Sequence, residues 1–277
     1  MFNSFFVVWR ESLEALLIVG ILYAWLKVND DKDGSGKRAL VAGIVGGIVL
    51  ALALGWALLT AQSELAGEAL EAFQSGALIV AALLISQMVW WMSRHGQRMK
   101  AELEGQIARA QGNKNRLAAQ WNIAVISALA IAREGAETVI FLYGIAQKPG
   151  AVSELVAGAC GGFVFAIGCA LVAAHGLAHL RLGTLLRLSS LLLLVLASSL
   201  LVAASDRLIG MDWLPALIDP VWDSSALIDH NAGVGRILAD FAGYRAQPAL
   251  TTLLVWGGYW LLVVIVALLG RQRKKPA

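Results

Sequence analysis

An Arg-Glu-x-x-Glu pattern occurs twice in this chain, each time inside a stretch that is otherwise apolar. The two copies begin at Arg10 and at Arg133. A charge at the centre of a lipid bilayer is unfavourable by about 2.5–3.5 kcal/mol on insertion scales, and each copy places three charges within five residues. Ionisable side chains in such segments indicate functional sites by default. The chain must therefore fold so that these charges are shielded inside a membrane domain.

The composition is that of a helical membrane protein. Of 277 residues, 58% are hydrophobic and 15% are charged, and the mean hydropathy is +0.70, whereas soluble domains carry about 25% charged residues. A spanning helix needs about 20 apolar residues, so we expect an all-α, polytopic protein in which residues 1–277 form a single transmembrane domain. The seven predicted transmembrane helices cover Phe2–Lys27, Ala39–Thr60, Phe73–Ser93, Trp121–Ala146, Ala151–His175, Thr184–Ala204 and Leu250–Gly270. The small net charge of +3 does not indicate binding to nucleic acid.

Basic residues predict the orientation of these spans. Lysine and arginine gather in alternate connections, so the positive-inside rule places the N-terminus outside and the C-terminus in the cytoplasm. Arg133 lies three spans after Arg10, so the two motif helices run in opposite directions. This indicates an inverted repeat of three plus three helices with one added, in which the substrate site lies near the midplane at the repeat interface. The predicted parts are repeat halves at residues 2–95 and 121–204, an outer loop at 205–248 and a last helix at 250–270.

The spacing within each motif brings its charges onto one helical face. Positions i, i+3 and i+4 are neighbours on a helix, so each arginine reaches the second glutamate and the two carboxylates converge. Together the motifs supply four carboxylates, which are hard ligands suited to iron, manganese, magnesium or calcium. These candidate ligands are Glu11, Glu14, Glu134 and Glu137. A structural alternative is a pair of buried ion-pair clusters, which would leave the excess negative charge of two facing motifs unbalanced.

Soft ligands are missing from the motifs. No cysteine or histidine lies within them, and the five methionines form no cluster along the sequence. This argues against copper(I) and against a thiolate zinc site. Among hard ions, ferric iron suits carboxylates best, whereas ferrous iron needs water to complete its shell.

Two further groups of residues are candidates for steps before and after this site. Glu64, Glu68 and Glu71 share one predicted helical face at the outer end of the third span, where they either capture cations or favour a helix start through the macrodipole. His175 and His179 are four residues apart at the inner end of the fifth span. They are either ligands for an exiting metal ion or ordinary interfacial histidines.

The predicted outer loop is long and contains an amphipathic run. The run covers residues 233–241 and ends before a glycine and a tyrosine. It predicts a short helix that lies on the membrane surface, either as an outer cap or as a docking face for a partner.

With these features the chain resembles a known family, the oxidase-dependent iron permeases, which include fungal plasma-membrane and bacterial iron-uptake permeases. The resemblance rests on the two motifs, Arg10–Glu14 and Arg133–Glu137, and it extends over essentially the whole chain. Further matching segments are Trp90-Trp91-Met92, Val221–Ser225 and Gly235–Tyr244 with Pro248 following.

The resemblance implies high-affinity import of iron, ferrous or ferric, across the bacterial cytoplasmic (inner) membrane. Iron is then the transported substrate, no organic cofactor is needed, and the protein is not an enzyme. Besides membrane lipid, the implied partners are separate periplasmic proteins, namely an iron oxidase or peroxidase or a cupredoxin-like protein. The implied iron ligands are Glu11, Glu14, Glu134 and Glu137, with Arg10 and Arg133 as charge-balancing residues.

Other functions stay open on the sequence. The same scaffold suits another divalent metal, such as manganese or lead. An intramembrane enzyme that uses its carboxylates as acid and base is a different class, although di-iron helices usually add a Glu-x-x-His pattern that neither motif has. A structural or assembly subunit is the third alternative.

Overall fold

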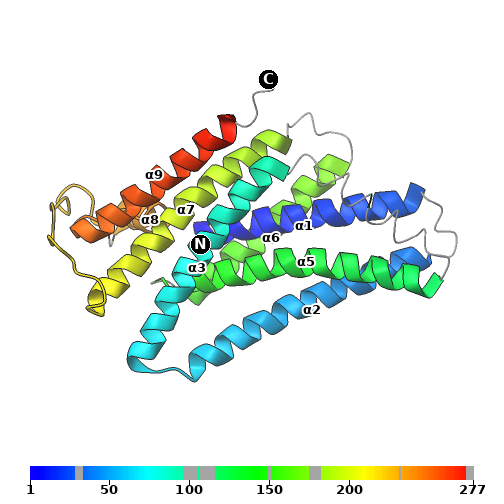
Figure 1. Ribbon diagram of the computed structural model, residues 1–277, viewed down its shortest axis with the longest axis horizontal. Helices are drawn as coiled ribbons and strands as arrows, with labels where there is room; N and C mark the ends of the chain where they lie inside the picture. The colour runs from blue at the N-terminus through cyan, green and yellow to red at the C-terminus, as the bar shows by residue number, and fades with distance from the viewer. Residues whose placement is uncertain are drawn as a thin grey trace. The chain divides into compact units, whose positions relative to one another are not determined.

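The computed structural model of the protein describes residues 1–28, 34–95, 105, 116–148, 151–174, 182–230 and 232–272. Over these residues the regular structure is helical and includes no strand. The helices are α1 (Phe2–Val28), α2 (Ser35–Ser63), α3 (Gly67–His95), α5 (Arg116–Ala146), α6 (Val152–Ala174), α7 (Leu182–Gly210), α8 (Gly233–Ala242) and α9 (Leu250–Gln272) (Figure 1). The prediction of an all-α protein is confirmed for this part of the chain.

Five of these helices are long and apolar enough to cross a membrane, namely α2, α3, α6, α7 and α9. Helices α1 and α5 are 27 and 31 residues long, more than the roughly 20 residues that a span requires, but each carries one charged motif. The structure therefore supports a polytopic membrane protein, and a helix occupies every segment that was predicted to span. The total of seven spans, the inverted repeat and the orientation stay predictions.

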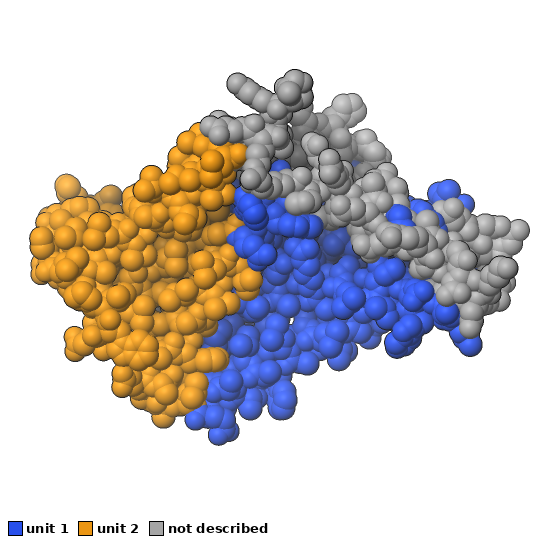
Figure 2. All heavy atoms as spheres, in the orientation of Figure 1, with its two compact units in different colours: residues 1–64, 87–191 blue, residues 65–86, 192–277 orange. Residues whose placement is uncertain are grey.

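The chain divides into two compact units, which Figure 2 colours separately. The first comprises residues 1–64 and 87–191, and the second comprises residues 65–86 and 192–277. Both motif helices, α1 and α5, belong to the first unit together with α2 and α6. All residues of the two motifs therefore lie in one compact body.

In the first unit, α2 packs along α5 through two glycines one turn apart. Gly43 lies against the backbone at Ala124, and Gly47 lies against the backbone at Ala128. A Cβ atom added to Gly47 would stand 2.8 Å from the carbonyl oxygen of Ala128, closer than real Cβ atoms approach. Glycine is required at this point because the two helices touch through their backbones, as they do in small-residue interfaces between membrane helices.

The same arrangement joins α6 to α1. Gly158 lies against the backbone at Met1, and Gly162 lies against the backbone at Phe5. Beside this contact a buried apolar cluster forms from Trp9, Leu13 and Ala166. Each motif helix is thus held along one side by a neighbour whose small residues permit close packing.

Gly47→Ala is expected to destabilise the protein, because the added methyl group has no room between α2 and α5. Overpacking of this kind lowers the free energy of unfolding by about 1–3 kcal/mol. The measurement is the midpoint of thermal unfolding of the purified protein in detergent. The amount of folded protein left after heating to each temperature is read by gel filtration. Gly168→Ala is the matched control, since a Cβ at Gly168 on α6 would contact nothing within 4 Å. Equal midpoints for the two variants would contradict the close approach of the helices.

The second unit is built from residues 67–86 of α3, most of α7, and helices α8 and α9. Asp206 on α7 binds the segment that enters α9, because Arg245 Nε lies 2.6 Å from its Oδ2 atom and Thr252 donates a hydrogen bond to its Oδ1 atom at 2.9 Å. Helix α8 coincides with the predicted amphipathic run, and its Val234 and Ile237 side chains are exposed. This short helix is confirmed, and its place on a membrane surface stays a prediction.

Candidate metal centre

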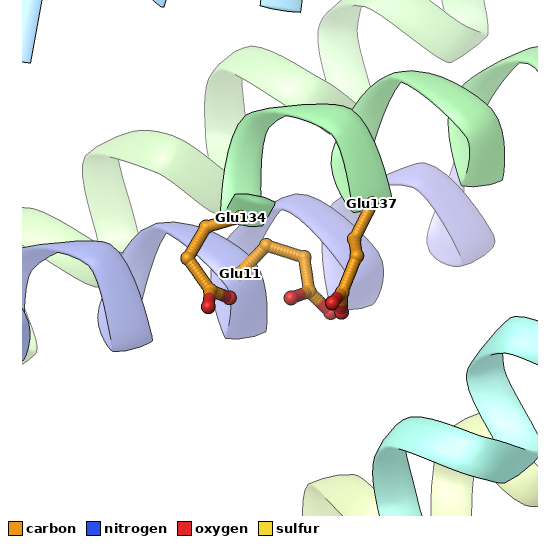
Figure 3. Close-up of side chains that lie close together, drawn as sticks. All are labelled: Glu11, Glu134 and Glu137. Carbon is orange, nitrogen blue, oxygen red and sulfur yellow. The ribbon is translucent and has the colours of Figure 1, made fainter. Parts of the chain in front are cut away.

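Three motif carboxylates converge where α1 and α5 lie side by side. Glu134 and Glu137 share one face of α5 because they are three residues apart, and Glu11 extends toward them from α1 (Figure 3). One ligand oxygen from each of the three lies within 4.8 Å of the others. Glu11 and Glu134 are buried, and Glu137 is partly buried. Such a set of convergent carboxylate oxygens suits a hard or borderline cation.

Each of these three carboxylates keeps one oxygen without a hydrogen bond. The buried Oε2 atoms of Glu11, Glu134 and Glu137 accept no hydrogen bond from any described residue. A buried charged oxygen is strongly unfavourable unless it is paired or coordinates a metal ion. The described contacts of the protein therefore do not satisfy this cluster by themselves, and a cation bound there would.

The arginine of the first motif is buried inside it. The Arg10 side chain is 0% exposed; its Nη1 atom lies 3.0 Å from Glu11 Oε1, and its Nη2 atom lies 2.8 Å from Glu14 Oε1. Glu14 thus forms the predicted i, i+4 ion pair. It is not among the three carboxylates whose ligand oxygens lie within 4.8 Å of one another. Of the four glutamates predicted to bind the ion, Glu14 is therefore the one outside the shared cluster, although Arg10 pairs with both Glu11 and Glu14.

The arginine of the second motif has a different environment. The Arg133 side chain is 45% exposed, its Nε atom lies 3.0 Å from Glu137 Oε1, and it stands 4.0 Å from Glu134 Oε1. Glu137 is therefore held by an i, i+4 pair like that of the first motif, whereas the contact of Glu134 with Arg133 is longer, at 4.0 Å. The two motifs are alike in sequence but unequal in burial.

Residues near the end of α3 complete the surroundings of both arginines. Arg10 donates through Nη1 to the Met88 sulfur and through Nη2 to the Met92 sulfur, the second at 3.0 Å. The guanidinium carbon of Arg133 lies 4.4 Å from the centroid of the Trp91 ring, a cation–π contact. These residues were not predicted from the sequence, and the prediction that the methionines form no cluster is wrong for Met88 and Met92. The signal was present, because residues four apart share one helical face.

The three outer glutamates do not share a single helix. Helix α3 begins at Gly67, which has a positive φ of 57°, and this left-handed residue separates α3 from α2. Glu64 lies before that break, so the prediction of one common face is wrong for it. Glu68 and Glu71 lie on α3, and Glu68 Oε1 accepts a hydrogen bond from Trp213 Nε1 at 2.8 Å. Their predicted part in cation entry stays a prediction.

The histidine pair and the outer loop are the two remaining predicted segments. His175 and His179 fall outside the described residues, so their part in ion exit stays a prediction. In the outer loop, the side-chain and backbone groups of Ser225 donate hydrogen bonds to Asp223, and Gln247 adds another. These bonds lower the pKa of the exposed Asp223 carboxyl group, because they stabilise its charged form.

The chain is similar to named permeases over nearly all of its length. Residues 1–271 match the Iron permease FTR1 family. The ferrous iron permease EfeU of Yersinia pestis is 28% identical over 266 residues, which cover 96% of this chain and 93% of the relative. The ferrous iron permease EfeU of Escherichia coli O6:K15:H31 (strain 536) is 26% identical over 269 residues, which cover 96% and 95%. A putative inactive ferrous iron permease EfeU of Escherichia coli K12 has the same identity and coverage. No solved structure matches the chain.

Proposed function

This chain belongs to the Iron permease FTR1 family, and on that premise we propose that it carries iron across a bacterial cytoplasmic membrane through the cluster of Glu11, Glu134 and Glu137. Membership in the family confirms the resemblance drawn from the two motifs. The observation that carries the proposal is the convergence of three carboxylates from α1 and α5, each with a buried oxygen that accepts no hydrogen bond from the described residues.

The charge of the site favours a bound cation over a purely structural cluster. Four motif glutamates and two arginines carry a formal net charge of −2. Buried ion pairs stabilise a protein only when each charge is well compensated, and a removed or missing partner is strongly destabilising. A divalent cation held by Glu11, Glu134 and Glu137 supplies the missing positive charge. Iron is the ion that the family name indicates.

The packing of the motif helices supports the proposal of an inverted repeat. The glycines of α2 contact α5 in the same register in which the glycines of α6 contact α1. Three pairs of positions are 123 residues apart, namely Met1 and Ala124, Phe5 and Ala128, and Arg10 and Arg133. In inverted repeats the substrate site lies at the repeat interface near the midplane of the membrane. The α1–α5 contact is then the place where the ion binds.

Transport is proposed to run inward, with the N-terminus outside and seven spans. Iron reaches the cluster from the outer side, where Glu68 and Glu71 raise the local concentration of cations. The periplasmic partners implied by the family are separate iron-handling proteins, an oxidase or peroxidase or a cupredoxin-like protein. The permease character of the relatives supports a transporter rather than an enzyme.

The test is uptake of radioactive iron into proteoliposomes that contain the purified protein. Iron is supplied either as Fe²⁺ under anaerobic reducing conditions or as Fe³⁺ citrate, under an imposed pH gradient. We expect saturable accumulation of iron that protein-free vesicles lack. Accumulation of manganese without iron would transfer the proposal to another divalent metal, and no accumulation of any metal would overturn it.

A further inference from the structure

The two thioethers at the site call for an explanation beyond packing. Met88 and Met92 lie one turn apart on α3, and both sulfur atoms contact the guanidinium of Arg10. Met88 is 4% exposed. Thioether sulfur is a weak hydrogen-bond acceptor, so two thioethers stabilise a fully buried guanidinium only weakly. The Nε atom of Arg10 accordingly has no partner among the described residues.

The sulfur atoms lie next to the carboxylate cluster. The same Nη1 atom of Arg10 contacts the Met88 sulfur and lies 3.0 Å from Glu11 Oε1. The Met88 sulfur and one carboxylate oxygen of Glu11, a cluster residue, therefore contact the same nitrogen atom. On the other side, Nη2 joins the Met92 sulfur to Glu14. The guanidinium is thus surrounded by two carboxylates and two thioethers, which is a ligand set for a metal cation.

We propose that Met88 and Met92 are specificity-determining residues that make this site select ferrous iron and other borderline or soft divalent ions over hard ones. Thioethers favour soft ions, whereas carboxylates and water suit magnesium, calcium and manganese. In the structure, Arg10 contacts both sulfur atoms. An ion that binds Glu11 replaces Arg10 Nη1 as the partner of that carboxylate and of the Met88 sulfur. Arg10 keeps its ion pair with Glu14. The inference rests on the proposed function, because it assigns the ion preference of the same site.

The two sulfur atoms change the ion preference that the motifs alone suggest. Four carboxylates without sulfur favour ferric iron, the hardest candidate. A mixed oxygen and sulfur set favours Fe²⁺ instead. It also separates Fe²⁺ from Mn²⁺, which has the same charge and differs mainly in its lower affinity for soft ligands.

The test compares two inhibitors of Fe²⁺ uptake, Cd²⁺ as a soft ion and Mn²⁺ as a hard one, in anaerobic proteoliposomes. The starting protein carries Cys160→Ala and Cys169→Ala, so that no thiol binds Cd²⁺. For this protein, the concentration of Cd²⁺ that halves Fe²⁺ uptake is expected to be about tenfold lower than that of Mn²⁺. In the Met88→Leu/Met92→Leu variant this ratio is expected to fall toward one, because leucine conserves volume but offers no sulfur.

The matched control is Met211→Leu, which removes a methionine of the second unit and is expected to leave the ratio unchanged. Cadmium X-ray absorption provides a second readout that needs no transport, and the sulfur signal should disappear in the double variant. If the double variant fails to fold, Met92→Leu alone is measured, since Met92 is only partly buried.

The inference would be overturned by an unchanged ratio in the double variant, or by the absence of a sulfur signal in the starting protein, which retains both methionines. The proposed function would still stand in that case, provided that the starting protein accumulates iron and a cluster variant does not. Absence of iron uptake in the starting protein is the distinct result that would overturn the proposed function itself. Equal loss of inhibition by Cd²⁺ and Mn²⁺ would assign the methionines to holding Arg10 only, which also contradicts the inference.

Discussion

Glu134→Gln is expected to reduce iron uptake by about 100-fold while leaving the amount of folded protein in the membrane unchanged. Loss of even an outer partner of a metal site typically lowers affinity 10–100-fold, and this change removes one of three converging ligands. Glutamine keeps the size and one oxygen of the side chain. Glu134 is the most informative of the three positions, because its nearest arginine nitrogen is 4.0 Å away and no close ion pair is broken.

The measurement is the initial rate of radioactive iron uptake into cells, normalised to protein abundance on an immunoblot. Glu154→Gln is the matched control, since this glutamate on α6 is 53% exposed and lies 3.8 Å from the N-terminal amine rather than in the cluster. We expect near-normal uptake for the control. Normal uptake by Glu134→Gln at normal abundance would rule out the carboxylate cluster as the ion path.

Arg10→Gln is expected to destabilise the folded protein far more than Arg133→Gln. Removal of one partner from a buried ion pair lowers stability by about 3–5 kcal/mol, because the remaining charge is left uncompensated. Arg10 is fully buried between Glu11 and Glu14. Arg133 is 45% exposed, and exposed pairs contribute only about 0–1 kcal/mol. The same substitution at the same position of the two motifs is thus expected to have two different consequences.

Thermal unfolding in detergent measures both variants against the wild type. The double variant Arg10→Gln/Glu14→Gln tests the cause, because it removes a positive and a negative charge together. We expect it to recover part of the stability that Arg10→Gln loses. Equal destabilisation by Arg10→Gln and Arg133→Gln would show that burial in the first motif does not determine its contribution.

Helix positions were predictable because they depend on local composition. Long apolar runs must form helices in a bilayer, since every backbone polar group there needs an internal partner. The predicted third span, Phe73–Ser93, lies within α3, which begins earlier at Gly67. The difference arises because hydropathy marks the apolar part of a helix, whereas Glu68 and Glu71 continue the same helix beyond that part. Glu64 could not be separated from α3 by periodicity, since the break depends on the conformation of Gly67.

The surroundings of the motifs were less predictable, because they come from helices distant in the sequence. The i, i+4 pairs of Arg10 with Glu14 and of Arg133 with Glu137 follow from helix geometry alone. The contacts of Arg10 with Met88 and Met92 join residues about 80 positions apart. No pattern within a single helix shows which face of another helix will meet it.

The sequence by itself determined that two charged motifs lie within apolar helices, that each motif pairs its arginine with its second glutamate, and that the chain belongs with the iron permeases. Only the tertiary structure decided that Glu11, Glu134 and Glu137 share one cluster without Glu14, that the Arg10 side chain is fully buried, and that α3 contributes sulfur and an aromatic ring. The physical reason is that local spacing sets which side chains share a helical face. The rotation and approach of whole helices, set here by backbone contacts at glycines, decide which faces meet.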